Sequence, residues 1–177
     1  MALKSTIFKA ELNVADVTRG YYADHVLTIA RHPSETDERM MIRLLAFALN
    51  AEERLRFGKG LSDVDEPDLL LEDLTGRIEA WIEVGQPDAR AILKACGKAR
   101  QVSVFAYSSS AKLWWQGIAK DLARARNLQV FAVPAEMTAQ LARLAGRTMQ
   151  LQCTIQEGSI LLSNAQTHLE IGVEQWR

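Results

Sequence analysis

The chain has 177 residues, a formal net charge of −1 and a sequence pI of about 6.3, so contact with nucleic acid would need a local basic patch. Its hydrophobic share of 48% can fill a core, and no apolar run reaches the ~20 residues of a membrane-spanning helix. The first residues lack the apolar segment of a signal peptide, and Cys96 and Cys153 have no metal-ligand spacing. We therefore expect one reduced, cytoplasmic domain over residues 1–177, with no membrane partner.

The N-terminal part predicts two strands and a helix. Residues 6–16 and 21–33 alternate in part between apolar and polar side chains, as strands do. Residues 34–54 predict a helix with Ser34 as its N-cap and acids in its first turn, where the helix dipole favours them. Residues 52–68 form a long loop candidate, and such loops are often functional.

The rest of the chain alternates helices with apolar strands. A hairpin is predicted over residues 66–86 and a second one, turning at Glu157–Gly158, over residues 148–163. Between them lie predicted helices at 87–99, 111–127 and 136–147 and predicted buried strands at 100–109 and 128–134, and residues 168–176 add a further strand. This order favours an α/β fold, a single layered domain whose mixed β-sheet is flanked by helices.

The hairpin over residues 66–86 carries acids on both strands. If Thr75–Gly76 is a two-residue turn, Asp68 lies opposite Glu83 and Glu72 lies opposite Glu79. Opposed Cβ atoms are ~4.5–5.5 Å apart, and like charges at that distance destabilise a sheet. A divalent cation between Asp68 and Glu83 would offset the repulsion. Solvation is the alternative, and we favour it for the pair nearer the turn.

Two resemblances start from these residues. Pro67–Asp68 followed by Glu83 in "IEVGQ" is similar to the motif of the PD-(D/E)xK nuclease superfamily. The stretches "YYADHVLTIARHPSETDERMM", "EPDLLLEDLTGRIEAWIEVGQPD" and "KACGKARQVSVFAY" resemble the YaeQ family of small bacterial proteins over nearly the full length. Together they imply a restriction endonuclease-like core with extra β-hairpins at both termini.

The resemblance also implies a metal site for Mg²⁺ or Mn²⁺. Asp68 and Glu83 would be ligands, and Glu38, or Asp37, would add an acid from the preceding helix. Ordinary N-terminal capping is the alternative role for the two helix acids.

One position departs from the superfamily pattern. Its lysine belongs two residues after the second acid, where this chain has Gly85. A bulge at Gly85 would return Gln86 to the acid face, where an uncharged amide would take the lysine's role. Alternatively, Lys94 reaches in from the next helix, on which Arg90, Lys94 and Lys98 share a face; a solvated basic face is the competing interpretation.

Two functional hypotheses follow. The first is a Mg²⁺-dependent phosphodiesterase acting on nucleic acid, in which Gln86 or Lys94 positions the attacking water. The second is a non-catalytic protein that retains the nuclease fold and binds a protein or nucleic acid. A locally basic helix with Lys112, Lys120, Arg124 and Arg126 is the candidate phosphate-facing strip. Repulsion between the acids further predicts that Asp68→Ala would stabilise the metal-free protein.

Overall fold

The chain forms two compact units. A computed structural model describes residues 4–59, 61, 63 and 65–177. The first unit comprises Met1–Ala51 and Glu136–Gly172, and the second comprises Glu52–Ala135 and Val173–Arg177. Each unit has its own β-sheet, so the expected single mixed sheet is corrected to two.

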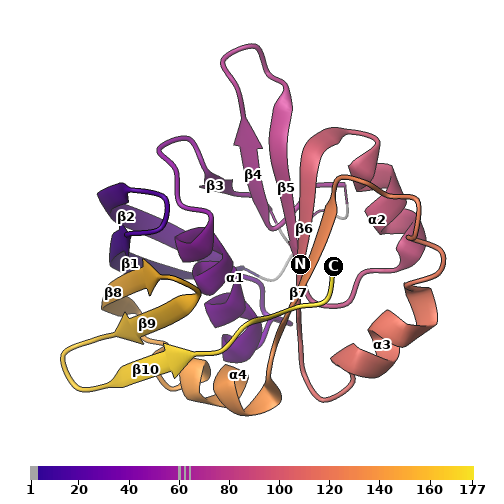
Figure 1. The fold of residues 1–177 in the computed structure, drawn as a ribbon. Helices are drawn as coiled ribbons and strands as arrows, with labels where there is room; N and C mark the ends of the chain where they lie inside the picture. The colour runs from indigo at the N-terminus through magenta and orange to yellow at the C-terminus, as the bar shows by residue number, and fades with distance from the viewer. Residues whose placement is uncertain (1–3, 60, 62, 64) are drawn as a thin grey trace. The chain divides into compact units, whose positions relative to one another are not determined.

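The elements follow one another in chain order (Figure 1). They are β1 (Thr6–Asp16), β2 (Tyr21–Arg31), α1 (Asp37–Leu49), β3 (Arg56–Phe57), β4 (Leu69–Glu72), β5 (Ile78–Val84), α2 (Ala89–Cys96), β6 (Ala99–Tyr107), α3 (Ala111–Ile118), β7 (Leu128–Val133), α4 (Ala135–Ala142), β8 (Thr148–Gln156), β9 (Ser159–Ser163), β10 (His168–Ile171) and β11 (Glu174–Gln175). No described helix is both long and apolar enough to cross a membrane.

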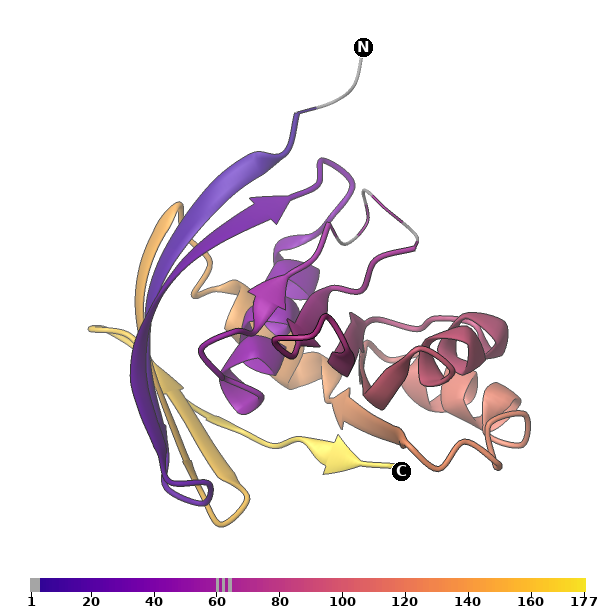
Figure 2. The same ribbon diagram turned by 90° about the horizontal axis from the view of Figure 1, so that it is seen from above.

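The sheet of the first unit joins the two ends of the chain. Its order is β10-β9-β8-β1-β2, and β1 runs parallel to β8 while the other neighbours are antiparallel. The strands curve around α1 (Figure 2). Their inward residues, such as Leu12 and Cys153, are buried, and burial raises the pKa of the Cys153 thiol to about 12. The two predicted terminal hairpins thus pair with each other through β1 and β8, which is why they form a sheet of their own.

The sheet of the second unit has the order β11-β7-β6-β5-β4-β3. Its three central strands, β5, β6 and β7, are parallel. Their core includes Trp81, Val102 and Val104 from the strands, and Ile92 and Ala95 from α2. Trp114 and Trp115 of α3 pack against the same core, so α2 and α3 cover one face of this sheet. Helix α3 ends at Ile118, before three of the four cations of the predicted basic strip.

The first helix begins later than the sequence predicted. Thr36 is its N-cap and accepts the Arg39 N–H at 3.2 Å, while the Ser34 hydroxyl lies 2.6 Å from Nδ1 of His32. Because the Ser34 side chain is hydrogen-bonded to His32 and not to the first turn of the helix, the prediction of Ser34 as the cap was wrong.

The turn of the β4–β5 hairpin also differs from the prediction. The Asp73 carboxylate accepts the Thr75 hydroxyl and the N–H groups of Arg77 and Thr75, which lowers its pKa. A register shift pairs Glu72 with Ile78. Glu72 therefore does not face Glu79. The inner register is as predicted, with Leu70 opposite Trp81.

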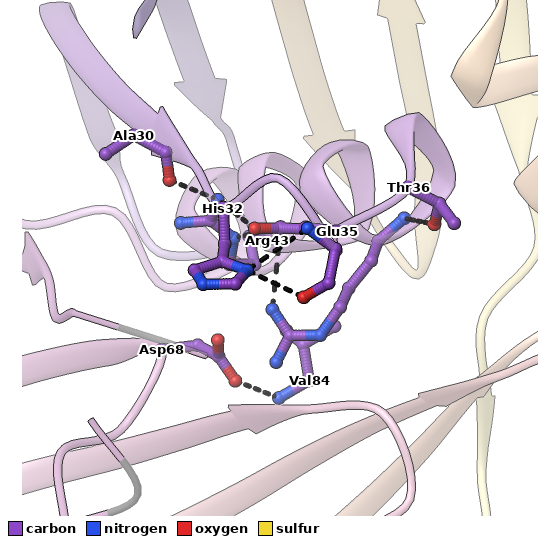
Figure 3. Close-up of polar contacts among 9 residues, drawn as sticks. Ala30, His32, Glu35, Thr36, Arg43, Asp68 and Val84 are labelled. Carbon is purple, nitrogen blue, oxygen red and sulfur yellow. Dashed lines mark hydrogen bonds and ion pairs between the residues drawn. The ribbon is translucent and has the colours of Figure 1, made fainter. Parts of the chain in front are cut away.

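A buried ion pair stabilises the first unit at the start of α1. Arg43 donates to both carboxylate oxygens of Glu35, at 2.8 and 2.9 Å, and to the carbonyl of Ala30 at 3.0 Å (Figure 3). Both side chains of the pair are only 2% exposed. Two parallel charge-assisted hydrogen bonds fix the geometry, and removing one partner of such a pair leaves an uncompensated buried charge.

Glu35→Ala is expected to lower the free energy of unfolding by about 3–5 kcal/mol. Glu38→Ala, a partly exposed residue of the first turn, is the matched control and is expected to cost less than about 1 kcal/mol. Urea denaturation measures both values. Equal losses for the two variants would show that the Glu35–Arg43 pair contributes nothing special.

His25 is a titratable group held against the core of the first unit. Its ring meets Phe47 edge-on at 5.0 Å between centroids, and the Tyr21 hydroxyl lies 2.9 Å from Nε2. Burial lowers the pKa of His25, and the Asp24 charge opposes that effect. The folded protein therefore binds a proton at His25 less readily than the unfolded chain does.

Stability should consequently fall as the pH drops below about 6.5, the ordinary pKa of histidine, because the unfolded chain then binds more protons. His25→Gln should flatten this part of the profile. His168→Gln, at an exposed position, is the control and should leave the slope unchanged. Melting temperatures between pH 7.5 and pH 5 test this, and an unchanged slope in His25→Gln would contradict it.

Candidate functional site

Asp68 lies where β4 and β5 separate. The ladder starts at the Leu69–Ile82 pair, and alternate residues of a strand direct their backbone groups to the same neighbour. Val84 is two residues beyond Ile82, and its N–H donates to Oδ2 of Asp68 at 2.8 Å (Figure 3). A carboxylate thus takes the place of a β4 carbonyl. Asp68 is 1% exposed, so this hydrogen bond is inside the protein.

The backbone of Pro67–Asp68 is in close contact with Gly58, which follows β3. Gly58 donates its N–H to the carbonyl of Asp68 at 2.9 Å. A Cβ atom at Gly58 would come within 2.0 Å of the Pro67 carbonyl oxygen, so no larger residue could approach this closely.

Glu83 and Asp68 each lie one residue beyond the last ladder pair, Ile82 with Leu69. Its Oε1 accepts a hydrogen bond from Nε1 of Trp81 at 2.8 Å. Trp81 is packed in the core beneath α2. The indole therefore holds the Glu83 carboxylate on the side of the sheet that α2 covers.

A small hollow of about 40 Å³ brings Glu83 together with the lysine candidate. It is lined by residues of β5 and α2 and by the loop before β4, among them Asp65, Trp81, Glu83, Lys94 and Lys98. Nζ of Lys94 lies 3.2 Å from a carboxylate oxygen of Asp65 in an exposed ion pair. Nζ of Lys98 lies 5.5 Å from the centroid of the Trp81 ring. Lys94 thus shares a surface with Glu83.

Gln86 has a different setting. Gly85 has a φ of 110°, in the region that favours glycine, and turns the chain after β5. The Gln86 amide then donates to the Tyr107 carbonyl and to the Ser108 hydroxyl, both at 2.7 Å. This side chain ties the end of β5 to the end of β6.

Glu38 belongs to the first unit, in the first turn of α1. Its neighbour Asp37 accepts a hydrogen bond from Arg31. The buried acid of this region is Glu35, which sequence reasoning missed. A signal was present, since Arg43 sits among apolar residues of the helix and needs a buried partner.

The donor set of the second unit suits a hard cation. Asp68 and Glu83 offer carboxylate oxygens, and Mg²⁺ is commonly held by one or two carboxylates while it keeps several waters. In the described part of the chain, no three His, Cys, Asp or Glu side chains come together as a metal-binding group. A cation held by these two carboxylates alone would keep much of its water shell.

These features define a two-sheet α/β protein with Asp68 and Glu83 at the open end of the β4–β5 hairpin. The chain belongs to the YaeQ family, whose model, described as "YaeQ protein", matches residues 1–173. It is 51% identical to the "Uncharacterized protein YaeQ" of Salmonella typhi and 47% identical to that of Escherichia coli K12, covering 100% of this chain and 98% of each relative.

Solved structures agree with this assignment. The YaeQ protein from Xanthomonas axonopodis pv. citri superimposes with a TM-score of 0.94 at 43% identity, covering 98% of both chains. The YaeQ protein from Pseudomonas syringae gives 0.94 at 39% identity, covering 98% of this chain and 96% of that one. The fold described above is therefore that of YaeQ structures.

The hydrogen bond to Val84 changes the expected effect of Asp68→Ala. Without the carboxylate, the buried Val84 N–H loses its acceptor, which costs about 1–3 kcal/mol. The melting temperature in EDTA should therefore fall, and Asp68→Asn, which keeps an acceptor oxygen, should lose less. A rise in Asp68→Ala would instead show that repulsion from Glu83 dominates, as the opposed charges alone predicted.

Proposed function

We propose that this protein is a Mg²⁺- or Mn²⁺-dependent phosphodiesterase acting on nucleic acid, with a centre related to that of the PD-(D/E)xK nucleases. One observation carries the proposal: the Asp68 carboxylate is bonded at the peptide that follows Glu83, and Glu83 lines one hollow with Lys94. The proposal places Asp68, Glu83 and Lys94 together at the end of β5.

The residues have distinct proposed roles. Asp68 and Glu83 are the proposed metal ligands. When bound, the cation would acidify a water and neutralise charge on the phosphate. Lys94 would hold the attacking water with its N–H donors, and exchange from Asp65 costs little because exposed ion pairs are weak. Gln86, whose amide N–H groups are engaged at the end of β6, would support the end of β5.

A second candidate is a non-catalytic binding or regulatory protein that retains this fold. Gly85 stands where the superfamily has its lysine, and both acids have hydrogen bonds that account for them without a metal. In this alternative, Asp68 completes the sheet and Glu83 anchors Trp81.

Thermal melting with Mg²⁺ or Mn²⁺, together with cleavage of labelled DNA and RNA, separates the two candidates. At a hundredfold excess over its Kd, a cation bound only by the folded state adds about 2.7 kcal/mol, roughly 5–10 °C for a chain of this size. The proposal expects this shift and metal-dependent cleavage, both lost in Asp68→Asn and Glu83→Gln.

Glu72→Gln is the matched control, because Glu72 lies on the same hairpin and pairs with Arg56, outside both the proposed metal site and the hollow with Lys94. It should keep both the metal shift and the cleavage. Failure of the parent protein to show either would leave the non-catalytic candidate standing.

A further inference from the structure

Alternate residues of β5 form a line of side chains on the face that α2 covers. Glu79, Trp81 and Glu83 follow each other at two-residue spacing, so they project to the same side. Arg100 of β6 pairs with Glu79 at 3.2 Å, and Lys98 lies over the Trp81 ring. The basic side chains of Arg100 and Lys98 thus lie beside Glu79 and Trp81 of β5.

This line connects two hollows. The first, which we call the hairpin hollow, is an open depression of about 600 Å³ lined by Gly76, Arg77, Ile78, Glu79, Lys98 and Arg100. The second is the 40 Å³ hollow with Glu83 and Lys94. Lys98 lines both of them, so the two hollows meet at its side chain. Figure 1 shows the β4–β5 hairpin, which carries the first hollow, projecting from its sheet.

The two hollows differ in charge. The hairpin hollow has three cations and one acid, whereas the other balances Lys94 and Lys98 against Asp65 and Glu83. The Arg100 side chain is 80% exposed, so its pair with Glu79 is readily exchanged for another anion. A local positive field is therefore present on a chain whose net charge is −1.

We infer that the hairpin hollow binds the phosphodiester backbone of a single nucleic acid strand and leads it past Lys98 to the acid pair. Arg77, Lys98 and Arg100 contact successive phosphates. The strand is read through its backbone, so binding is independent of base sequence. The inference rests on the proposed function for the class of ligand, but it requires no metal and no cleavage.

The hairpin hollow is favoured over the basic strip that follows β6. Of that strip, only Lys112 is in α3, and Lys120, Arg124 and Arg126 lie beyond its end. The described lining of the hollow with Glu83 includes no residue of that strip. The hairpin hollow shares Lys98 with the hollow that Glu83 lines.

Binding of a labelled 20-nucleotide single strand, followed by fluorescence anisotropy in EDTA at several salt concentrations, tests the inference. The triple variant Arg77→Gln, Lys98→Gln, Arg100→Gln should weaken binding at least about tenfold and reduce the salt slope by about 2, since each phosphate contact on a single strand contributes about 0.7. The double variant Arg77→Lys, Arg100→Lys keeps the charge and should bind like the parent.

Lys112→Gln, Lys120→Gln, Arg124→Gln is the matched control, because it removes the same charge from exposed positions elsewhere in the unit. It should change the affinity less than about threefold, as should a change from oligo(dT) to a mixed sequence. Equal losses in both triple variants, an unaffected hairpin variant, strong sequence preference or no binding by the parent would each overturn the inference.

The cleavage assay keeps this inference separate from the proposed function. Binding that depends on the hairpin hollow without cleavage in Mg²⁺ or Mn²⁺ supports the inference and removes the phosphodiesterase. Cleavage that is unaffected by the hairpin triple variant retains the enzyme and overturns the inference.

Discussion

The hydrogen bond from the Val84 N–H to Asp68 is the constraint on which the second unit's candidate site depends. It extends the β4–β5 pairing beyond the Leu69–Ile82 pair and so fixes the register of the last residues of β5. That register places Trp81 and Glu83 on the side covered by α2. A slip of one residue would exchange the faces of the strand and move Trp81 and Glu83 together to the opposite side.

Local patterns predicted most elements but not how they assemble. Alternation and apolar runs identified the strands, and the hairpin at Glu157–Gly158 is present as expected. The pairing of β1 with β8 joins residues about 140 positions apart, and nothing local specifies such a partner, so two sheets were predicted as one. The start of α1 was misjudged because Ser34 and Thr36 are both good caps, and only the bond to His32 decides between them.

The predicted strand register identified the candidate acids, but it did not predict the hydrogen-bond donors around them. Treating Asp68 and Glu83 as bare charges ignored their donors, a backbone N–H and an indole N–H. Hydrogen bonds to an ionised carboxylate are strong, and they offset part of the repulsion between neighbours. The same holds nearer the turn, where Glu72 and Glu79 each lie beside an arginine, Arg56 and Arg100. Such partners come from other strands and cannot be read from the hairpin alone.

The backbone at position 85 does not suit the lysine that the PD-(D/E)xK pattern has at this place. With φ at 110°, any L side chain there would be strained, although space is open around the Cα atom. The chain turns at Gly85, and the Gln86 amide is hydrogen-bonded at the end of β6. Position 85 therefore carries no lysine side chain, and Gln86 is bonded away from Glu83. The cation of the proposed centre would therefore come from another element. Helix α2 follows directly, and its Lys94 already lines the hollow with Glu83.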